Sequence, residues 1–368
     1  MIKVGKPCHS ACETEKIKEV FDSGCLTGKC EIVREYERDF ADACDAKHAI
    51  ATSSGTTALH TALLALDIKE GDEVIVPDYT FVASAFAIMH CGAIPILADV
   101  KRDTFGIDIE DMQRKITKRT KAAMVVNQYG LPVDIDELME IARKNDLRVI
   151  GDTATGLGSE YKGKKAGSFF DCECFSTFPT KIISTGEGGM LTTNNMGISE
   201  DARAIIDFGR TKKGGVTRLG YNYRLSAIQA AIGICQLKEL SKFIKKRRTI
   251  AQYYNKRIEE IDWLTPQYEP RDRKSAWQRF VCIVPLKRKA SLRDDIIAYM
   301  KEQGVECTRG NDALHQMDYF ESYYFPRVDC VNSAYVYRHA IALPMHYGMS
   351  KNDVNSIIKK MVEFRKKK

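Results

Sequence analysis

Short apolar strands alternate with amphipathic helices through the first two thirds of the chain, and this alternation limits the fold more than any other feature. Buried strands are predicted at 73–77, 93–99, 122–127 and 147–151. Such alternation is typical of βαβ units, whose right-handed crossovers place helices on both faces of a mainly parallel sheet. The sequence therefore predicts an α/β fold that binds ligands at the carboxyl ends of its strands. The expected helices are 55–66, 82–91, 109–116 and 136–145.

The rest of the chain predicts a second, smaller α/β unit. One long helical pattern runs from about residue 228 to 258, and the stretch 266–275 is rich in charge and turn formers. A strand at 279–285 and a helix at 292–302 follow. A chain of 368 residues is long enough for two such domains.

Composition excludes several classes of protein. Hydrophobic residues make up 44% and charged residues 29%, as in ordinary globular chains. No apolar run approaches the roughly 18 to 20 residues that cross a bilayer, and residues 1–18 show no signal-peptide pattern. We therefore expect a cytoplasmic protein that does not bind membranes. Its N-terminal segment and large domain are expected over 1–244, and a small C-terminal domain over 245–368.

Neither the basic residues nor the cysteines form a recognisable site. The net charge is +7, and its densest runs, 245–248 and 365–368, are expected on solvated faces, which argues against nucleic-acid binding. The twelve cysteines include no CxxC pair and are expected as reduced thiols. No metal site is expected.

Three segments carry chemistry, and the first is the hydroxyl-rich loop 52–57, which opens a helix. Unpaired N–H groups and the dipole at a helix N-terminus favour a bound phosphate. The same residues also suit an ordinary N-cap, so this loop alone does not decide between the two.

The second segment is 149–154, in which Asp152 directly follows a buried strand. Its carboxylate is expected at the edge of the sheet where ligands bind, and there it can keep a cationic ring nitrogen protonated. An Asp that caps the next turn has the same sequence pattern.

The third segment is 174–181, Cys-Phe-Ser-Thr-Phe-Pro-Thr-Lys, followed by Gly-Glu-Gly-Gly at 186–189. Desolvation among such aromatic neighbours depresses the pKa of a lysine, which Schiff-base formation requires. A surface lysine is the commoner alternative. The glycines match neither a Walker loop nor a dinucleotide fingerprint. Taken together, a phosphate cradle, an anion for a pyridinium and an amine for an aldehyde match pyridoxal 5′-phosphate (PLP).

Several motifs in this sequence occur together and in the same order in a known family. They are Ser54–His60, Gly71–Phe81, Gly92–Pro95, Asp152, Tyr161–Lys164, Phe175–Ser176 with Lys181, and Gly220–Arg224. Through them the chain resembles the DegT/DnrJ/EryC1/StrS family of PLP-dependent nucleotide-sugar aminotransferases over nearly its whole length. Residues 185–189 are most similar to the branch of 4-keto sugar aminotransferases near perosamine synthase. The resemblance implies fold type I, the aspartate aminotransferase-like fold, with a large mainly parallel sheet domain and a smaller C-terminal α/β domain.

The resemblance also implies a role for each site residue. Lys181 would join the cofactor covalently and later move the proton, and Asp152 would bind the pyridine nitrogen. Asn222 would reach the cofactor phosphate of the neighbouring subunit, so that a homodimer shares its active sites. The phosphate would be held by Thr56, Thr57 and Ser176, the ring would lie between Phe81 and Ala154, and the sugar nucleotide would lie near Glu187 and His315.

Four positions depart from the family pattern. Thr155 stands where Gln, His or Glu usually lies near the ring hydroxyl of the cofactor. Leu157 replaces a common His, and Cys25 a common Trp. The segment 311–315 lacks the usual aromatic-Pro pair before His315. Cys25 and the segment 311–315 leave the identity of the substrate open.

The activity that the resemblance implies is a ping-pong transamination. The amino donor would be L-glutamate, which leaves as 2-oxoglutarate, and the acceptor a nucleotide-linked 4-keto-6-deoxy sugar, as in lipopolysaccharide biosynthesis. Amination of a 3-keto sugar is the alternative. A sugar 3-dehydratase of the same fold is disfavoured, because that branch carries His in place of Lys181.

Overall fold

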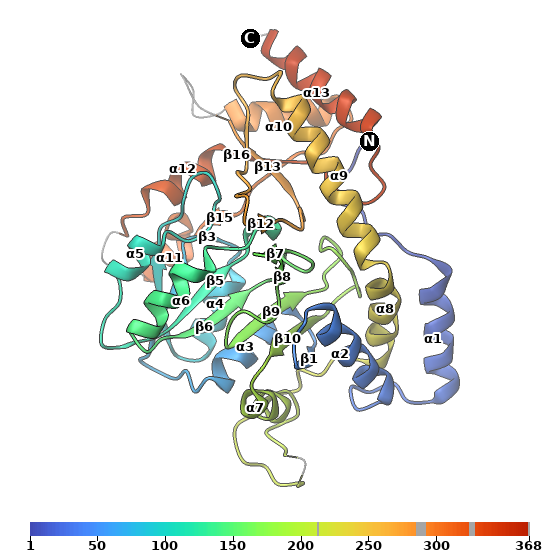
Figure 1. The fold of residues 1–368 in the computed structure, drawn as a ribbon, viewed down its shortest axis with the longest axis vertical. Helices are drawn as coiled ribbons and strands as arrows, with labels where there is room; N and C mark the ends of the chain where they lie inside the picture. The colour runs from blue at the N-terminus through green and yellow to red at the C-terminus, as the bar shows by residue number, and fades with distance from the viewer. Residues whose placement is uncertain (212, 285–291, 324–327, 367–368) are drawn as a thin grey trace.

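A seven-stranded sheet forms the centre of the large domain in this computed structural model, which describes residues 1–211, 213–284, 292–323 and 328–366. The strands from β9 to β4 run parallel, while β10 is antiparallel to both of its neighbours. The predicted α/β fold with a mainly parallel sheet is therefore confirmed (Figure 1). In sheet order the strands are β1 (His48–Thr52), β10 (Gly189–Thr193), β9 (Cys172–Ser176), β6 (Arg148–Asp152), β5 (Thr120–Val126), β2 (Glu73–Pro77) and β4 (Ile94–Ala98).

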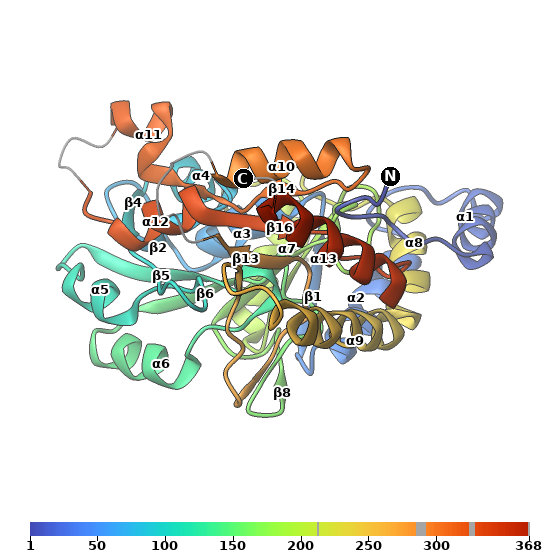
Figure 2. The same cartoon turned by 90° about the horizontal axis from the view of Figure 1, so that it is seen from above.

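Both faces of this sheet are buried under helices, which explains why its strands are continuous apolar runs. On β2, Val74 and Val76 face the core beneath α3 and α4, whereas Ile75 faces the core beneath α5 and α6. Figure 2 shows the two helical layers on opposite sides of β2 and β5. The helices of this domain are α1 (Ala11–Ser23), α2 (Glu31–Ala43), α3 (Gly55–Ala65), α4 (Ala83–His90), α5 (Ile109–Arg114), α6 (Ile135–Lys144), α7 (Met196–Ile206) and α8 (Ala227–Lys238).

The small domain packs its own sheet, in the order β11-β13-β16-β14, against three helices at the top of Figure 1. Tyr254 and Phe280 stack in its core, with ring centroids 4.6 Å apart. Its elements are α9 (Leu240–Ile258), β11 (Thr265–Pro266), β13 (Phe280–Ile283), α10 (Leu292–Glu302), β14 (Thr308–Arg309), α11 (Asp318–Tyr323), α12 (Val331–His339), β16 (Ala340–Leu343) and α13 (Lys351–Lys366). Short pairs complete the chain: β3 (Tyr79–Thr80) with β15 (Asp312–Ala313), and β7 (Glu160–Tyr161) with β8 (Lys164–Lys165) and β12 (Arg273–Lys274).

One predicted helix is two helices in the structure. The long pattern from 228 to 258 divides into α8 and α9 at Glu239, whose N–H bonds to the carbonyl of Gln236 three residues back. A hydrogen bond to the residue three positions back closes a tighter turn than the bond to the fourth residue back that an α-helix repeats. The predicted helix 292–302 is confirmed, and the predicted strand 279–285 is shorter, beginning at Phe280, with residue 285 outside the described part.

The expected domain boundary between 244 and 245 falls inside α9. The beginning of the chain also packs on the small domain, because Ile2 bridges Val305 and the carbonyl of Val4 accepts from the N–H of Met345. We propose to keep the division at this place, with α9 shared by both domains and the first residues assigned to the small one.

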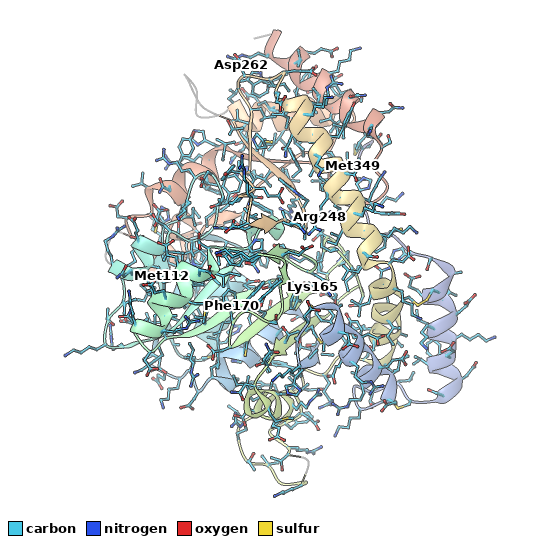
Figure 3. All side chains as sticks on the ribbon, viewed as in Figure 1. Met112, Lys165, Phe170, Arg248, Asp262 and Met349 are labelled. Carbon is cyan, nitrogen blue, oxygen red and sulfur yellow. A yellow bond between two sulfur atoms is a disulfide. The ribbon has the colours of Figure 1, made fainter. Side chains whose placement is uncertain are left out.

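The basic run 245–248 is only partly solvated, so the expectation for it is wrong at two positions. Arg247 is buried, and its Nη1 donates to the carbonyls of Trp277, Gln278 and Met345. Arg248, labelled in Figure 3, donates to the carbonyls of Ser275 and Gly158 and to Glu160. Because the run lies on a helix, Arg247 and Arg248 face inward, and their hydrogen bonds join α9 to the segments that it packs against.

Four cysteines also differ from expectation, because the structure contains two disulfides. Cys12–Cys235 joins α1 to α8 across 223 residues of sequence, and Cys25–Cys30 closes a short loop before α2. The expectation of reduced thiols throughout is wrong for these four. Sequence spacing could not indicate the first pair, since only the packing of α1 on α8 brings its Cα atoms to 5.9 Å.

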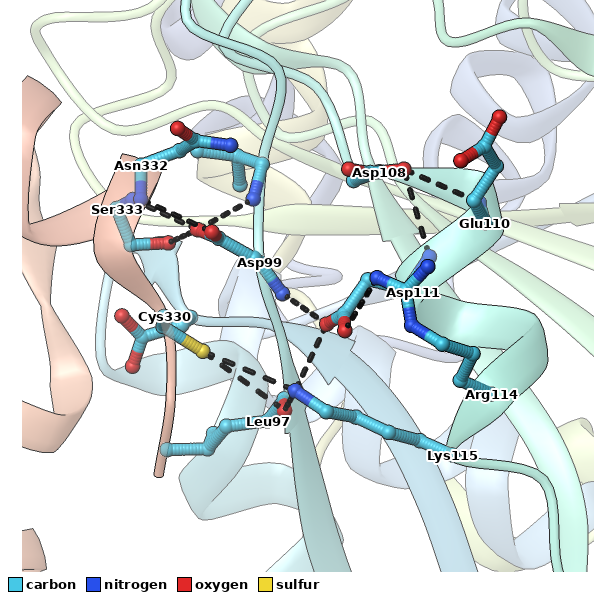
Figure 4. Close-up of polar contacts among 12 residues, drawn as sticks. Leu97, Asp99, Asp108, Glu110, Asp111, Arg114, Lys115, Cys330, Asn332 and Ser333 are labelled. Atoms are coloured by element: carbon cyan, nitrogen blue, oxygen red, sulfur yellow. Dashed lines mark hydrogen bonds and ion pairs between the residues drawn. The ribbon is translucent and has the colours of Figure 1, made fainter. Parts of the chain in front are cut away.

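A polar network holds α12 against the large domain (Figure 4). Asp99, directly after β4, accepts hydrogen bonds from the N–H groups of Asn332 and Ser333 in the first turn of α12. The backbone N–H of Asp99 in turn donates to Asp111, which also forms an ion pair with Lys115 at 2.7 Å. Asp99 thus acts as an N-cap from a distant part of the chain and fixes how α12 meets β4.

In the described part of the chain, none of the helices has the length and apolar character of a membrane span. Among the same residues, no group of three or more His, Cys, Asp or Glu side chains is arranged to hold a metal ion.

Candidate active site

A cavity of about 320 Å³ lies at the carboxyl ends of β5, β6 and β9 and is closed on one side by residues of the small domain. Its volume falls within the roughly 300–1,000 Å³ that is usual for small-molecule sites. Most of the predicted site residues line it: Thr56, Phe81, Asp152, Ala154, Thr155, Ser176, Lys181 and Glu187.

The N-terminus of α3 forms one end of this cavity. Ser54 caps the helix by accepting from the N–H of Thr57 at 3.1 Å, and the Thr57 hydroxyl returns to the carbonyl of Ser54 at 2.9 Å. A Cβ atom on Gly55 would lie only 2.8 Å from the Cβ of Ser176, so glycine lets the helix end approach β9 closely. The remaining N–H groups, with the hydroxyls of Thr56 and Ser176, suit a phosphate. Thr57 itself does not line the cavity, because its side chain completes the cap.

The glycine-rich segment 186–189 lies beside this helix end. A Cβ atom on Gly189 would come within 2.2 Å of the Ser54 carbonyl oxygen, so only glycine fits there. Glu187 lies exposed at the cavity, and its backbone carbonyl accepts from Gln229 at 2.6 Å. Its side chain stays a predicted contact to the substrate.

Asp152 ends β6 and is fixed by two hydrogen bonds. Its Oδ2 accepts from the hydroxyl of Ser84 at 2.7 Å, and its Oδ1 accepts from the N–H of Ala154 at 3.1 Å. Burial raises the pKa of this carboxyl above its usual value, while these two hydrogen bonds and the charge of Lys181 oppose the shift. A carboxylate held in such a place is stabilised by a cationic partner, and a protonated ring nitrogen would be one.

Lys181 lies in the loop after β9, where its N–H donates to the carbonyl of Phe178 at 2.9 Å. Burial lowers the pKa of its amine from 10.5 to about 8; the positive charge of Arg279 acts in the same direction, and Asp152 opposes it. A substantial fraction of the amine is therefore neutral near pH 8, as nucleophilic attack on an aldehyde requires.

Phe81 and Thr155 line the cavity in different ways. Phe81 is 62% exposed, which leaves an aromatic face open to a ligand ring. Thr155, which stands where the family carries a longer polar side chain, donates its hydroxyl to the carbonyl of Asn127 at 2.8 Å. Its proton is therefore already used, and the hydroxyl of Thr155 can offer a ligand only an acceptor.

Besides Thr57, two predicted residues do not line the cavity. Asn222 is exposed, in the segment that pairs with Asp207 after α7. The ring Nδ1 of His315 lies 2.6 Å from the carboxylate of the buried Asp78, and the backbone N–H of His315 donates to the same carboxylate. His315 does not line the cavity, whereas Asn311, four residues earlier, does.

Sequence reasoning missed several residues that the fold brings to the site. Ser84, which holds Asp152, is the single hydroxyl in the apolar run 83–88 and could have been noticed for that reason. Gln278, Arg279 and Asn311 come from the small domain, about 100 residues or more after Lys181. No local motif marks the last three.

The residues present fit PLP. Because position 55 is a glycine, the N-terminus of α3 lies close to Ser176, so its N–H groups and the Ser176 hydroxyl could hold one phosphate, and Lys181 lines the same cavity. Asp152 would provide a buried anion for the ring nitrogen, and Phe81 an open aromatic face. A fold of type I with these four features defines a PLP-dependent transferase.

Comparisons with known proteins agree with this class. The sequence model of the DegT/DnrJ/EryC1/StrS aminotransferase family matches residues 7–362 of this chain. GDP-perosamine synthase from Caulobacter vibrioides is 35% identical over 362 residues, which cover 97% of this chain and 96% of the relative. Among solved structures, Helicobacter pylori PseC, an aminotransferase involved in the biosynthesis of pseudoaminic acid, superposes with a TM-score of 0.92 at 26% identity and covers 98% of both chains. The PLP form of a putative sugar aminotransferase from Streptococcus pneumoniae shares the fold, with a TM-score of 0.93 at 24% identity over 98% of both chains.

The chain belongs to the DegT/DnrJ/EryC1/StrS aminotransferase family. It is therefore a sugar aminotransferase that uses PLP, and it acts on an amino donor and a carbonyl acceptor.

Proposed function

We propose that this enzyme moves the amino group of L-glutamate to a nucleotide-linked 4-keto-6-deoxy sugar, giving 2-oxoglutarate and a 4-amino sugar nucleotide. The observation that carries the proposal is the similarity to GDP-perosamine synthase along nearly the whole chain, combined with Lys181 and Asp152 in one cavity. GDP is therefore the first nucleotide to test. We also propose a cytoplasmic location, because nucleotide sugars and free amino acids are cytoplasmic metabolites.

The residues of the cavity divide the work of the reaction. PLP, when bound, supplies an aldehyde that accepts the amino group and a ring that withdraws electrons from the carbon losing its proton. The helix end at Thr56, with Ser176, would hold its phosphate, and Asp152 would keep its ring nitrogen protonated. The Nζ atom of Lys181 would take the proton from the α-carbon of the donor, and in the second half it would return a proton to C4 of the sugar.

A screen of acceptors tests the proposal. The protein is first converted to its pyridoxamine form with L-glutamate, and nucleotide-linked 3-keto and 4-keto sugars are then added one at a time. We expect the absorbance of the PLP form to return fastest with a GDP-linked 4-keto-6-deoxy sugar. Return with 3-keto sugars alone would contradict the proposed position of amination, and no return with any keto sugar would contradict the proposed acceptor.

We further propose a homodimer in which each active site receives Asn222 from the other subunit. Asn222 is exposed and lies away from the cavity of its own chain, as a residue that serves a neighbouring site must. A second copy of this chain is thus the proposed partner.

Hybrid dimers test this sharing. Lys181→Ala and Asn222→Ala should each be impaired alone, the second because losing a hydrogen bond to a charged group weakens binding by roughly 10- to 100-fold. When the two are unfolded together and refolded, each hybrid should contain one intact site, so activity measured at low PLP should rise well above that of either parent. If Asn222 serves its own chain, mixing restores nothing.

A further inference from the structure

Arg279 is a cation in the active-site cavity, and no carboxylate of the described residues forms an ion pair with it. It directly precedes β13, lines the cavity, and makes no ion pair or hydrogen bond with any residue that the structure describes. Other shielded arginines are partnered: Arg247 bonds to three carbonyls, and Arg203 contacts Glu37 at 2.9 Å. A guanidinium that lines a cavity without a partner is available to bind an anion supplied from outside the chain.

The residue before it gives a second, independent indication of a ligand. Gln278 is 3% exposed and lines the same cavity. Its Nε2 donates to the carbonyl of Thr180 at 2.6 Å, but its Oε1 has no hydrogen-bond partner in the described structure. A buried acceptor left open beside a free guanidinium suits a ligand that carries both an N–H group and a negative charge.

Arg279 and the phosphate cradle come from different parts of the chain. The cradle is built by α3 and β9 of the large domain, whereas Arg279 belongs to the small-domain wall and acts electrostatically on Lys181, Tyr79 and Tyr129. Of the carboxylates that line the cavity, Asp152 bonds to Ser84 and Ala154, and neither it nor Glu187 pairs with Arg279. The guanidinium of Arg279 and the amine of Lys181 therefore line the same cavity.

We propose that Arg279 binds the α-carboxylate of the amino donor and that Gln278 accepts a hydrogen bond from the donor's amino group. The proposal rests on the proposed function. In an α-amino acid the carboxylate is bonded to the same carbon as the amine, so it must lie close to the reacting centre. In the acceptor, the diphosphate is attached across the hexose ring from C4 and lies farther away. A guanidinium can also bind a carboxylate through two parallel hydrogen bonds.

Single-turnover measurements on the PLP-loaded enzyme test the role of Arg279. In Arg279→Met, the half-saturating concentration of L-glutamate should rise about 10- to 100-fold, because a charge-assisted hydrogen bond is lost. The reaction with 4-aminobutyrate, which is L-glutamate without its α-carboxylate, should be unchanged. Arg279→Lys should restore part of the affinity for L-glutamate, since the charge remains without the planar pair of donors.

Arg148→Met is the matched control, because Arg148 begins β6 at its far end and contacts Asp171 on the surface. Arg148→Met also removes one positive charge, and it should leave the reactions with L-glutamate and with 4-aminobutyrate unchanged. The second half-reaction, with the keto sugar nucleotide and the pyridoxamine form, should not change in Arg279→Met. If Arg279→Met leaves the half-saturating concentration of L-glutamate unchanged, the proposal is wrong. It is also wrong if Arg279→Met impairs only the reaction with the sugar nucleotide, since Arg279 would then bind the diphosphate. If no keto sugar reacts with the pyridoxamine form, the proposed acceptor is wrong. The reactions with L-glutamate and 4-aminobutyrate do not need the acceptor, so they still test the role of Arg279.

Discussion

Lys181→Ala is expected to lower turnover by at least about 10⁴-fold, because the variant loses the proposed nucleophile, which is also the group proposed to move the proton. The wild-type amine is suited to both tasks, since burial lowers its pKa to about 8 and no other lysine lines the cavity in the described part of the chain. The measurement is steady-state transfer from L-glutamate to the keto sugar nucleotide.

The variant should nevertheless retain pyridoxamine phosphate, because the phosphate cradle and Asp152 do not depend on Lys181. Bound cofactor, followed by its absorbance after gel filtration, therefore separates loss of chemistry from loss of the site. Lys121→Ala, which changes an exposed lysine on β5, is the control and should behave as the wild type. Residual turnover above about one per cent of the wild-type rate would assign the proton transfer to another residue.

The large sheet could be predicted because its strands are short, apolar and separated by helices. The strand predicted at 73–77 matches β2 residue for residue, since both of its faces are buried and its ends are set by charged and turn-forming neighbours. The division of the long helix at Glu239 could not be predicted, because no Gly or Pro marks it. The disulfide between Cys12 and Cys235 depends on tertiary packing alone.

The candidate site was predictable to the extent that it lies in local motifs. Asp152 ends a strand, and Lys181 and the helix end at Thr56 follow strands within a few residues; the strands of a parallel sheet bring such segments to one edge. Arg279 and Asn311 reach the same cavity only because the small domain folds back over that edge. Their sequence neighbourhoods resemble an ordinary strand and loop, so only the tertiary structure reveals them.

Asp152→Asn is expected to lower turnover by about 10²- to 10³-fold, the usual effect of removing one preorganised electrostatic contact from an active site. The substitution keeps the shape of the side chain but removes the charge that we propose keeps the ring nitrogen protonated. It also places an NH₂ group where an oxygen now accepts from Ser84 or from the N–H of Ala154. The measurement is the rate of the L-glutamate half-reaction at saturating donor.

Ser84→Ala separates these two effects, because it removes the hydrogen bond to Oδ2 and leaves the carboxylate in place. A neutral side chain cannot favour a cationic ring at any pH, whereas a carboxylate that has lost one donor still can. We therefore expect Ser84→Ala to lower the rate of the L-glutamate half-reaction by only about 10-fold, in keeping with the loss of one hydrogen bond to a charged group. If Asp152→Asn were no slower than Ser84→Ala, the charge at position 152 would not be what drives the chemistry, and Asp152 would serve only to fix the geometry of the loop that follows β6.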